Sequence, residues 1–221
     1  HNDARRQRQM CIRDSRFQAG IQGIYFDNLG GQIDFEPASD AHTTNNWGME
    51  LNVRRLEGWA KLGKVYADKP WKSVGFQVAA SNHVQTSYFG MKNYDATQNT
   101  WYANLMYQSI FSNTNHKFRM GLSAVIDDYK EQLDTLNFDR LEAVPGAFVE
   151  YTFSHLEKVS LVVGGRVDYH NSYGVFFTPR LHFRYSPAEL ASLRLSVGRG
   201  QRSASIISEN IGLLASSRDR L

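Results

Sequence analysis

A period-two alternation of apolar and polar residues, sustained over unusually long segments, is the feature that most constrains the fold of this chain. Between residues 72 and 88 the apolar side chains fall on even positions and the polar side chains on odd positions. Successive side chains of a β-strand point to opposite faces, so this pattern predicts one strand of about 17 residues with an apolar face and a polar face. The even positions are Val74, Phe76, Val78, Ala80, Val84 and Tyr88, and the odd ones are Ser73, Gln77, Ser81, His83, Gln85 and Ser87.

The same period recurs along the chain and predicts an all-β fold. Tight turns rich in Pro, Asn, Asp and Ser are expected at 67–71, 112–116, 154–158 and 187–191. Longer loops are expected at 28–49, 89–97, 130–143 and after Gly200, and 172–175 is a short connection among them. Because short and long connections tend to alternate, we predict an antiparallel up-and-down meander whose two rims differ. The nine expected strands lie near 16–27, 50–66, 72–88, 98–111, 117–129, 144–154, 159–171, 176–186 and 192–199.

The length of these strands favours part of a large transmembrane β-barrel, because globular strands usually have about five or six residues. No run of about 18 apolar residues occurs, so no transmembrane helix is predicted. A soluble β-sandwich also alternates and is the competing interpretation. Aromatic residues near both ends of the apolar positions match the interfacial girdles of membrane barrels. They are Tyr66, Trp71, Phe111, Phe118, Phe153 and Tyr185 beside the short turns, and Tyr88, Trp101 and Tyr169 toward the long loops.

Residues 1–15 differ from the rest of the chain, being polar, basic and without a period. The segment Met10–Ser15 resembles a translated sequencing adapter, so we expect a non-native segment, with a disordered basic N-terminus as the alternative. The one cysteine, Cys11, lies there, and a cysteine-free remainder suits an oxidising compartment. We expect residues 16–221 to form a partial outer-membrane β-barrel of about nine strands, truncated at both ends, so that the chain is an internal fragment of a longer protein.

The C-terminal stretch carries the most specific pattern. It reads FTPRLHFRYSP at 177–187 and LRLSVGRG at 193–200, followed by Arg202 and Glu209. A Pro-Arg strand, a short turn, a strand ending in Gly-x-Gly and an arginine with a downstream glutamate resemble the β-barrel of the TonB-dependent outer-membrane receptors. The segments VPGAFVEY at 144–151 and GGRVD at 164–168 also resemble that family, and a weaker likeness extends over 17–221.

The resemblance implies a barrel of about 22 strands, closed by a separate N-terminal plug domain, in the outer membrane of a Gram-negative cell. It implies four partners: outer-membrane lipid, the plug, the TonB complex acting through the plug, and a small extracellular ligand of the siderophore, cobalamin or glycan class. The segment 201–204 reads QRSA, which departs from the Phe-Arg-Ala-Pro of haem importers and argues against haem. A passive outer-membrane porin or a barrel-anchored adhesin is the alternative function, and a soluble carbohydrate-binding β-sandwich is a lesser one.

Charged residues at the polar positions of the last strands, and just beyond them, are the candidate site. Such a wall could attract an anionic ligand or pair with carboxylates of a plug. The competing interpretation is a solvated lumen wall whose charges pair with one another across strands. The candidates expected to face the lumen or the plug are Glu150, Arg166, Asp168, Arg180, Arg184, Arg194, Arg202 and Glu209.

No catalytic residue, metal site or cofactor is predicted, and we expect a protein that is not an enzyme. The sequence has no Gly-x-Ser-x-Gly elbow and no phosphate-binding loop before a helix. His83, His170 and His182 share the inward parity but lack the spacing of a metal-ligand set. The acidic run at 127–131 is expected to be the solvated base of a loop, because it lacks the spacing of a calcium loop. A net charge of +3 is too small to indicate nucleic acid.

Overall fold

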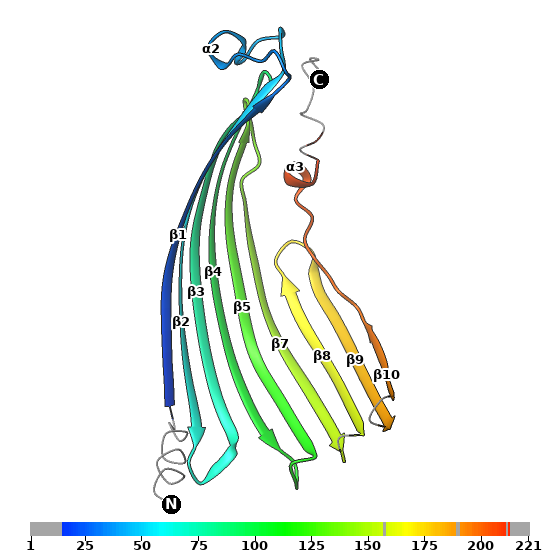
Figure 1. Cartoon of the computed structure of the whole chain (residues 1–221). Helices are drawn as coiled ribbons and strands as arrows, with labels where there is room; N and C mark the ends of the chain where they lie inside the picture. The colour runs from blue at the N-terminus through cyan, green and yellow to red at the C-terminus, as the bar shows by residue number, and fades with distance from the viewer. Residues whose placement is uncertain (1–14, 157, 189–190, 211, 213–221) are drawn as a thin grey trace, which may run out of the picture.

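The chain forms one curved antiparallel sheet in the computed structural model, which describes residues 15–156, 158–188, 191–210 and 212 (Figure 1). Strands pair in the order β1-β2-β3-β4-β5-β7-β8-β9-β10, and the short β6 pairs with β5. The predicted up-and-down meander is therefore confirmed. The strands are β1 (Ser15–Gly31), β2 (Gly48–Tyr66), β3 (Lys69–Phe89), β4 (Lys92–Ile110), β5 (His116–Leu133), β6 (Leu136–Asn137), β7 (Arg140–His155), β8 (Val159–His170), β9 (Gly174–Ala188) and β10 (Ala191–Gly198).

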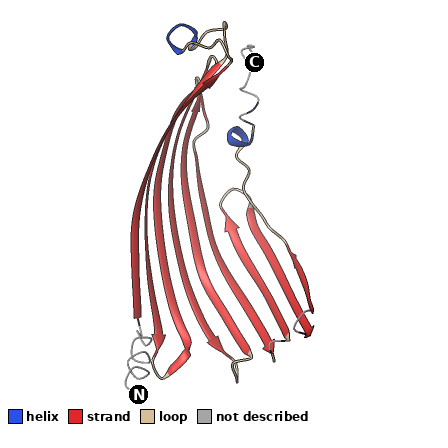
Figure 2. Ribbon diagram, viewed as in Figure 1, coloured by secondary structure: helices blue, strands red, loops and turns tan. Residues whose placement is uncertain are grey.

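In the described residues α-helix is confined to two single turns, α2 (Pro37–Asp40) and α3 (Ile206–Glu209), which lie away from the body of the sheet (Figure 2). Within the described residues, no helix has the length and apolar character needed to cross a membrane. Ser15 pairs with Lys64, so β1 begins at the last residue of the segment expected to be non-native. The rest of that segment, including Cys11, lies outside the described residues.

The register of the ladders sorts the side chains into two faces, since residues directly opposite each other in a sheet share a face. The apolar face contains one continuous row, Ala19, Ala60, Val78, Ala103, Ala124 and Pro145. The next row toward the short turns is Phe17, Leu62, Phe76, Leu105, Leu122 and Ala147. The apolar and polar positions predicted from the sequence therefore lie on opposite faces of the sheet.

The apolar face has no protein packed against it in the described part of the chain. Leu122 is 61% exposed and Phe177 is 54% exposed, and the described residues contain only three buried hydrophobic side chains, Tyr88, Phe89 and Tyr94. A β-sandwich would need a second sheet over this face. The described residues form one sheet, so the sandwich interpretation is wrong.

The apolar face has a sharp upper limit. On β5 it extends from Phe118 to Ile126, a length close to the roughly 9–11 residues that a tilted transmembrane strand needs. The next outward row is polar on β3, β4 and β5, because Asn82 donates to the side-chain oxygen of Asn99 at 2.7 Å and Asn99 lies opposite Asp128. The strands continue beyond this row, so the upper part of β2–β5 projects past the apolar band (Figure 1).

Two of the expected loops are strand instead. β3 and β4 are joined by a tight turn at Gly90, with φ of 61°, rather than by a loop over 89–97. β5 continues to Leu133, so the acidic run at 127–131 lies in a strand and not at the base of a loop. Above the apolar band polar and apolar side chains occur on both faces. The sequence period therefore disappears there although the hydrogen-bonded ladder continues.

The β1–β2 connection is a folded loop over 32–47 built around one buried carboxylate. Asp40 accepts hydrogen bonds from the backbone N–H of Glu36 at 3.0 Å, from the Asn46 amide at 3.0 Å and from the Ser39 hydroxyl at 3.2 Å. These bonds, that of Asn46 first, hold the pKa of Asp40 below its ordinary value. The loop is therefore organised by an ionised side chain.

The wall is lower on its C-terminal side, where β8 and β9 end well below the tops of the preceding strands (Figure 1). The β7–β8 ladder begins at Gly146, so the start of β7 pairs with β5 but has no partner strand on its other side. Asn171 occupies this place: its amide donates to the carbonyl of Leu141 at 2.6 Å and accepts from the N–H of Ala143 at 3.2 Å. One side chain thus continues the ladder beyond the end of β8.

Candidate functional site: the polar face of the wall

Six of the eight predicted site residues lie in strands, and the register places all six on the polar face. One row contains Arg119, Glu150, Gly164 and Arg180. A second row contains Ser123, Gly146 and Asp168, and Arg166 lies two residues from Asp168 on the same face. Arg184 and Arg194 face each other directly on β9 and β10.

Because Gly146 on β7 has no side chain, Arg166 on β8 can reach Ser123 on β5 across it. Arg166 donates to Asp168 at 2.6–2.9 Å and reaches the Ser123 hydroxyl at 2.7 Å. A Cβ on Gly146 would lie 1.9 Å from Oδ1 of Asp168. The pair is therefore fixed across the intervening strand because that strand has glycine at this position.

Gly164 permits a second crossing of the same kind. Arg180 on β9 forms an ion pair with Glu150 on β7, and its Nε lies 3.1 Å from where a Cβ on Gly164 would be. Arg119 on β5 approaches the other carboxylate oxygen of Glu150 at 4.0 Å. Glu150 thus interacts with two arginines, Arg119 on β5 and Arg180 on β9.

The last two predicted site residues pair with each other beyond β10. Arg202 donates to Glu209 at 2.6 Å, and Glu209 also accepts from the backbone N–H of Ser205 at 3.3 Å. This ion pair is exposed, so it contributes little to stability. It lies in the segment 199–210 rather than in the wall.

A buried network above the apolar band was not foreseen from the sequence. The Tyr94 hydroxyl donates to Glu131 at 2.8 Å, and Arg140 donates to Glu131 and, through Nε, to Glu142 at 2.9 Å. Glu142 lies 3.4 Å from Nε2 of His170. Burial raises the pKa of Tyr94, so the phenol stays protonated and acts as a donor. The network joins β4, β5, β7 and β8.

His170 ends this network and connects the wall to the segment after β10. Its Nδ1 accepts the backbone N–H of Ser172 at 3.1 Å, which places the ring proton on Nε2 in the neutral tautomer. Nε2 lies 3.1 Å from the Ser203 hydroxyl as well as near Glu142. The rings of Tyr173 and Phe176 pack against the imidazole, whose residue is only 2% exposed.

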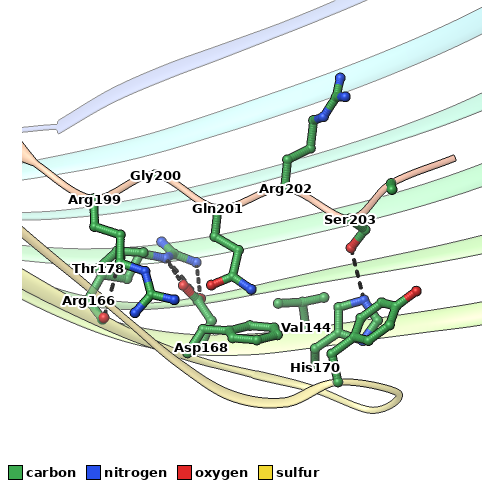
Figure 3. A pocket seen from close by; sticks show the side chains of 13 residues that line it. Val144, Arg166, Asp168, His170, Thr178, Arg199, Gly200, Gln201, Arg202 and Ser203 are labelled. Carbon is green, nitrogen blue, oxygen red and sulfur yellow. Dashed lines mark hydrogen bonds and ion pairs between the residues drawn. The ribbon is translucent and has the colours of Figure 1, made fainter. Parts of the chain in front are cut away.

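A cleft of about 820 Å³ lies between the wall and the segment 199–204 (Figure 3). Arg199, Gln201 and Ser203 point toward the wall, whereas Arg202 points away from it. Arg166, Asp168 and His170 line the opposite side, together with Val144, Tyr173, Phe176 and Thr178. The cleft therefore offers guanidinium and amide donors beside aromatic rings, which suits a small polar or anionic molecule.

The sequence did not predict the residues of the buried network, because the period-two alternation is lost in the segments that contain them. Arg140 and Glu142 stand in a stretch expected to be loop, and Glu131 was placed in a solvated run. The even position of His170 correctly predicted that it lies on the polar face, but it did not predict the contact with Glu142. Among the described residues no three His, Cys, Asp or Glu side chains converge as a metal site would require.

A long antiparallel wall with one bare apolar face and one charged, hydrogen-bonded face defines the class of membrane β-barrel walls. The chain belongs to the TonB-dependent receptor-like β-barrel family, whose model matches residues 10–212. That family consists of receptors and transporters.

Two solved structures show the same fold. The alcaligin outer-membrane receptor FauA from Bordetella pertussis is 13% identical with a TM-score of 0.65, and the match covers 84% of this chain and 32% of that one. The siderophore receptor PirA from Pseudomonas aeruginosa is 9% identical with a TM-score of 0.58, covering 88% of this chain and 38% of that one. This chain thus spans between 32% and 38% of their lengths. No curated protein matches the chain.

Proposed function

We propose that this chain is part of the wall of a TonB-dependent receptor in the Gram-negative outer membrane. The intact receptor takes up a scarce extracellular ligand, and the siderophore class is favoured over cobalamin or a glycan. The family match supports the receptor. The two structural relatives, which are named as receptors for alcaligin and for a siderophore, support the ligand class.

The observation that carries the proposal is the contrast between the two faces at the same height of the wall. The apolar face is exposed over a band as tall as a bilayer's hydrocarbon core, which fits lipid as its cover. The polar face is crosslinked by ion pairs that reach over glycines. This arrangement fits the inner wall of a large barrel. In the intact receptor that barrel would enclose an N-terminal plug, and the TonB complex would act on the plug.

The cleft beside segment 199–204 supports a small extracellular ligand. It lies at the ends of β8 and β9 that their connection joins, on the same side of the sheet as the connections from β1 to β2, β3 to β4 and β5 to β7. Arg199 brings positive charge to it, since the charge of Arg166 is balanced by Asp168, and Tyr173 and Phe176 bring aromatic surface. Ferric siderophores are often anionic, and such a lining attracts anions.

Uptake by the full-length receptor tests the proposal. The gene is expressed in a Gram-negative host that lacks its own siderophore receptors, and uptake of iron-labelled siderophores is measured with and without a functional TonB. We expect accumulation that requires both the receptor and TonB. Solute flux that is the same without TonB would support a passive porin instead, and cell adhesion without any flux would support an adhesin.

A further inference from the structure

We propose that the cleft beside segment 199–204 selects a ferric siderophore with a single negative charge, and that Arg199 is the residue that recognises this charge. The inference rests on the proposed function, because it names the kind of siderophore that the cleft takes. A neutral iron centre with one free carboxylate fits, as in a trihydroxamate siderophore that bears a carboxyl group. A tris-catecholate does not fit, because three dianionic catecholates leave three negative charges on its ferric centre.

One positive charge at the cleft is left unbalanced in the described part of the chain. Arg166 is bound by both carboxylate oxygens of Asp168 at 2.6–2.9 Å. Arg199 lines the same cleft, and among the described residues no carboxylate lies within ion-pair distance of it. The lining therefore supplies one uncompensated guanidinium, which can balance one anionic group of a ligand but not three.

The other end of the cleft disfavours further negative charge. His170 accepts the backbone N–H of Ser172 at Nδ1, as a neutral imidazole does, and Glu142 lies 3.4 Å from its Nε2. Glu142 shares one cation, Arg140, with Glu131. These three charged groups carry one negative charge in excess behind the imidazole, so a polyanion that extends along the cleft is repelled at this end.

The rest of the lining suits a neutral iron centre. Val144, Phe176 and Ala204 contribute apolar surface, and Tyr173 and Thr178 contribute hydroxyl groups. Hydroxamate complexes present methylene chains and amide-like oxygens, which pack against apolar surface and accept hydrogen bonds from hydroxyls. The cleft volume of about 820 Å³ suits a molecule of this size.

Arg199 is positioned before a ligand arrives, because segment 199–204 is held near both ends. The backbone N–H of Arg199 donates to the carbonyl of Pro179 at 3.1 Å. At the far end the Ser203 hydroxyl lies 3.1 Å from Nε2 of His170. Between them Gln201 points toward the wall, where its carboxamide can donate beside the guanidinium (Figure 3). Donors that are already in place lower the entropic cost of binding.

Arg202 lies on the same segment but does not serve the cleft. Its side chain points away from the wall (Figure 3), and it donates to Glu209 at 2.6 Å. The sequence pattern singled out Arg202, whereas it is Arg199 that faces the cleft. The two arginines therefore form a matched pair for mutation.

Binding of three ferric probes to the purified full-length receptor tests the inference. Two probes are made from one linear trihydroxamate, whose free amine is capped with succinate, which adds a carboxylate, or with acetate, which adds no charge. The third probe is a tris-catecholate. We expect the succinylated probe to bind about 10- to 100-fold more tightly than the acetylated one, and the tris-catecholate to bind most weakly. Equal binding of the two capped probes, or tightest binding of the tris-catecholate, would overturn the inference.

Variants locate the charge recognition. Arg199→Gln should weaken binding of the succinylated probe about 10-fold or more and leave the acetylated probe unchanged, whereas Arg202→Gln should change neither. Asp168→Asn removes the counter-charge of Arg166, so it should strengthen binding of the tris-catecholate several-fold. The amount of heat-modifiable barrel is measured for each variant, so a loss of folding is recognised. Unchanged binding of the succinylated probe by folded Arg199→Gln would overturn the inference.

Uptake of the same probes by cells with and without TonB separates this inference from the proposed function. TonB-dependent uptake of the tris-catecholate or the acetylated probe in preference to the succinylated one would overturn the charge selection and leave the receptor function standing. The absence of TonB-dependent uptake for all three probes would overturn the proposed siderophore receptor, and the inference with it.

Discussion

Replacing Leu181 by arginine places a charge at the centre of the apolar band. Leu181 is the middle of the outward-facing residues of β9, and its neighbours in the row are Val163 and Val197. No carboxylate in that row can pair with the new guanidinium. Near the bilayer midplane an arginine on the lipid face costs about 2–4 kcal/mol. That cost lowers the folding equilibrium of the full-length receptor by about 30- to 1,000-fold.

The adjacent residue provides the matched control. His182 points to the polar face, where its Nδ1 lies 2.9 Å from the Ser196 hydroxyl. His182→Arg removes that contact and adds a cation to a wet surface, which costs about 1 kcal/mol or less. Both variants introduce an arginine at neighbouring positions of the same strand, so the main difference between them is the face that receives the charge.

The assay is urea unfolding of the full-length receptor in liposomes, followed by the heat-modifiable band on gels. We expect a large loss of stability for Leu181→Arg and near-normal folding for His182→Arg. Equal tolerance of the two changes would refute lipid contact of the apolar face. Greater sensitivity of His182→Arg would show that the faces are inverted.

Three further predictions concern the wall and its loop. Gly146→Val should lower the free energy of unfolding by about 1–3 kcal/mol, because the new side chain displaces Asp168; urea unfolding checks this, and Gly23→Ala, with open space around it, should have little effect. Arg140→Met should cost about 2 kcal/mol in the same assay, because it leaves two buried carboxylates without their shared cation, and an unchanged midpoint would contradict this. The lowered pKa of Asp40 means that its contribution is present above the ordinary carboxyl pKa and is lost as the pH falls through the lowered value. Amide exchange in residues 32–47, corrected for its intrinsic rate, should therefore rise below about pH 4, and a loop equally protected there would contradict this.

The fold was predictable where one face of a strand is apolar and the other polar. Alternation around Val78 and Leu181 gave the strands, their faces and the order of pairing. It failed at 89–97 and 127–131, where the strands stand above the apolar band and polar side chains occur on both faces. In such segments backbone hydrogen bonds maintain the strand, and the sequence shows no alternation of apolar and polar residues from which the strand could be predicted.

The candidate site was predictable only in part for a related reason. Parity placed Glu150, Arg166 and Arg180 on one face, because facing is a local property of each strand. Their partners depend on register between strands, which the sequence of one strand does not contain. The roles of Gly146 and Gly164 follow from that register alone.

The two glycines also carry information about assembly. A slip of two residues would keep every side chain on its own face, so the hydrophobic pattern cannot forbid it. Such a slip between β8 and β9 would set Arg180 opposite Val162 or Arg166 instead of Gly164. The first would block its path to Glu150 and the second would oppose two guanidinium groups. Each glycine thus helps to specify the register, because the ion pair that crosses it can form in only one alignment of the neighbouring strands while the barrel assembles.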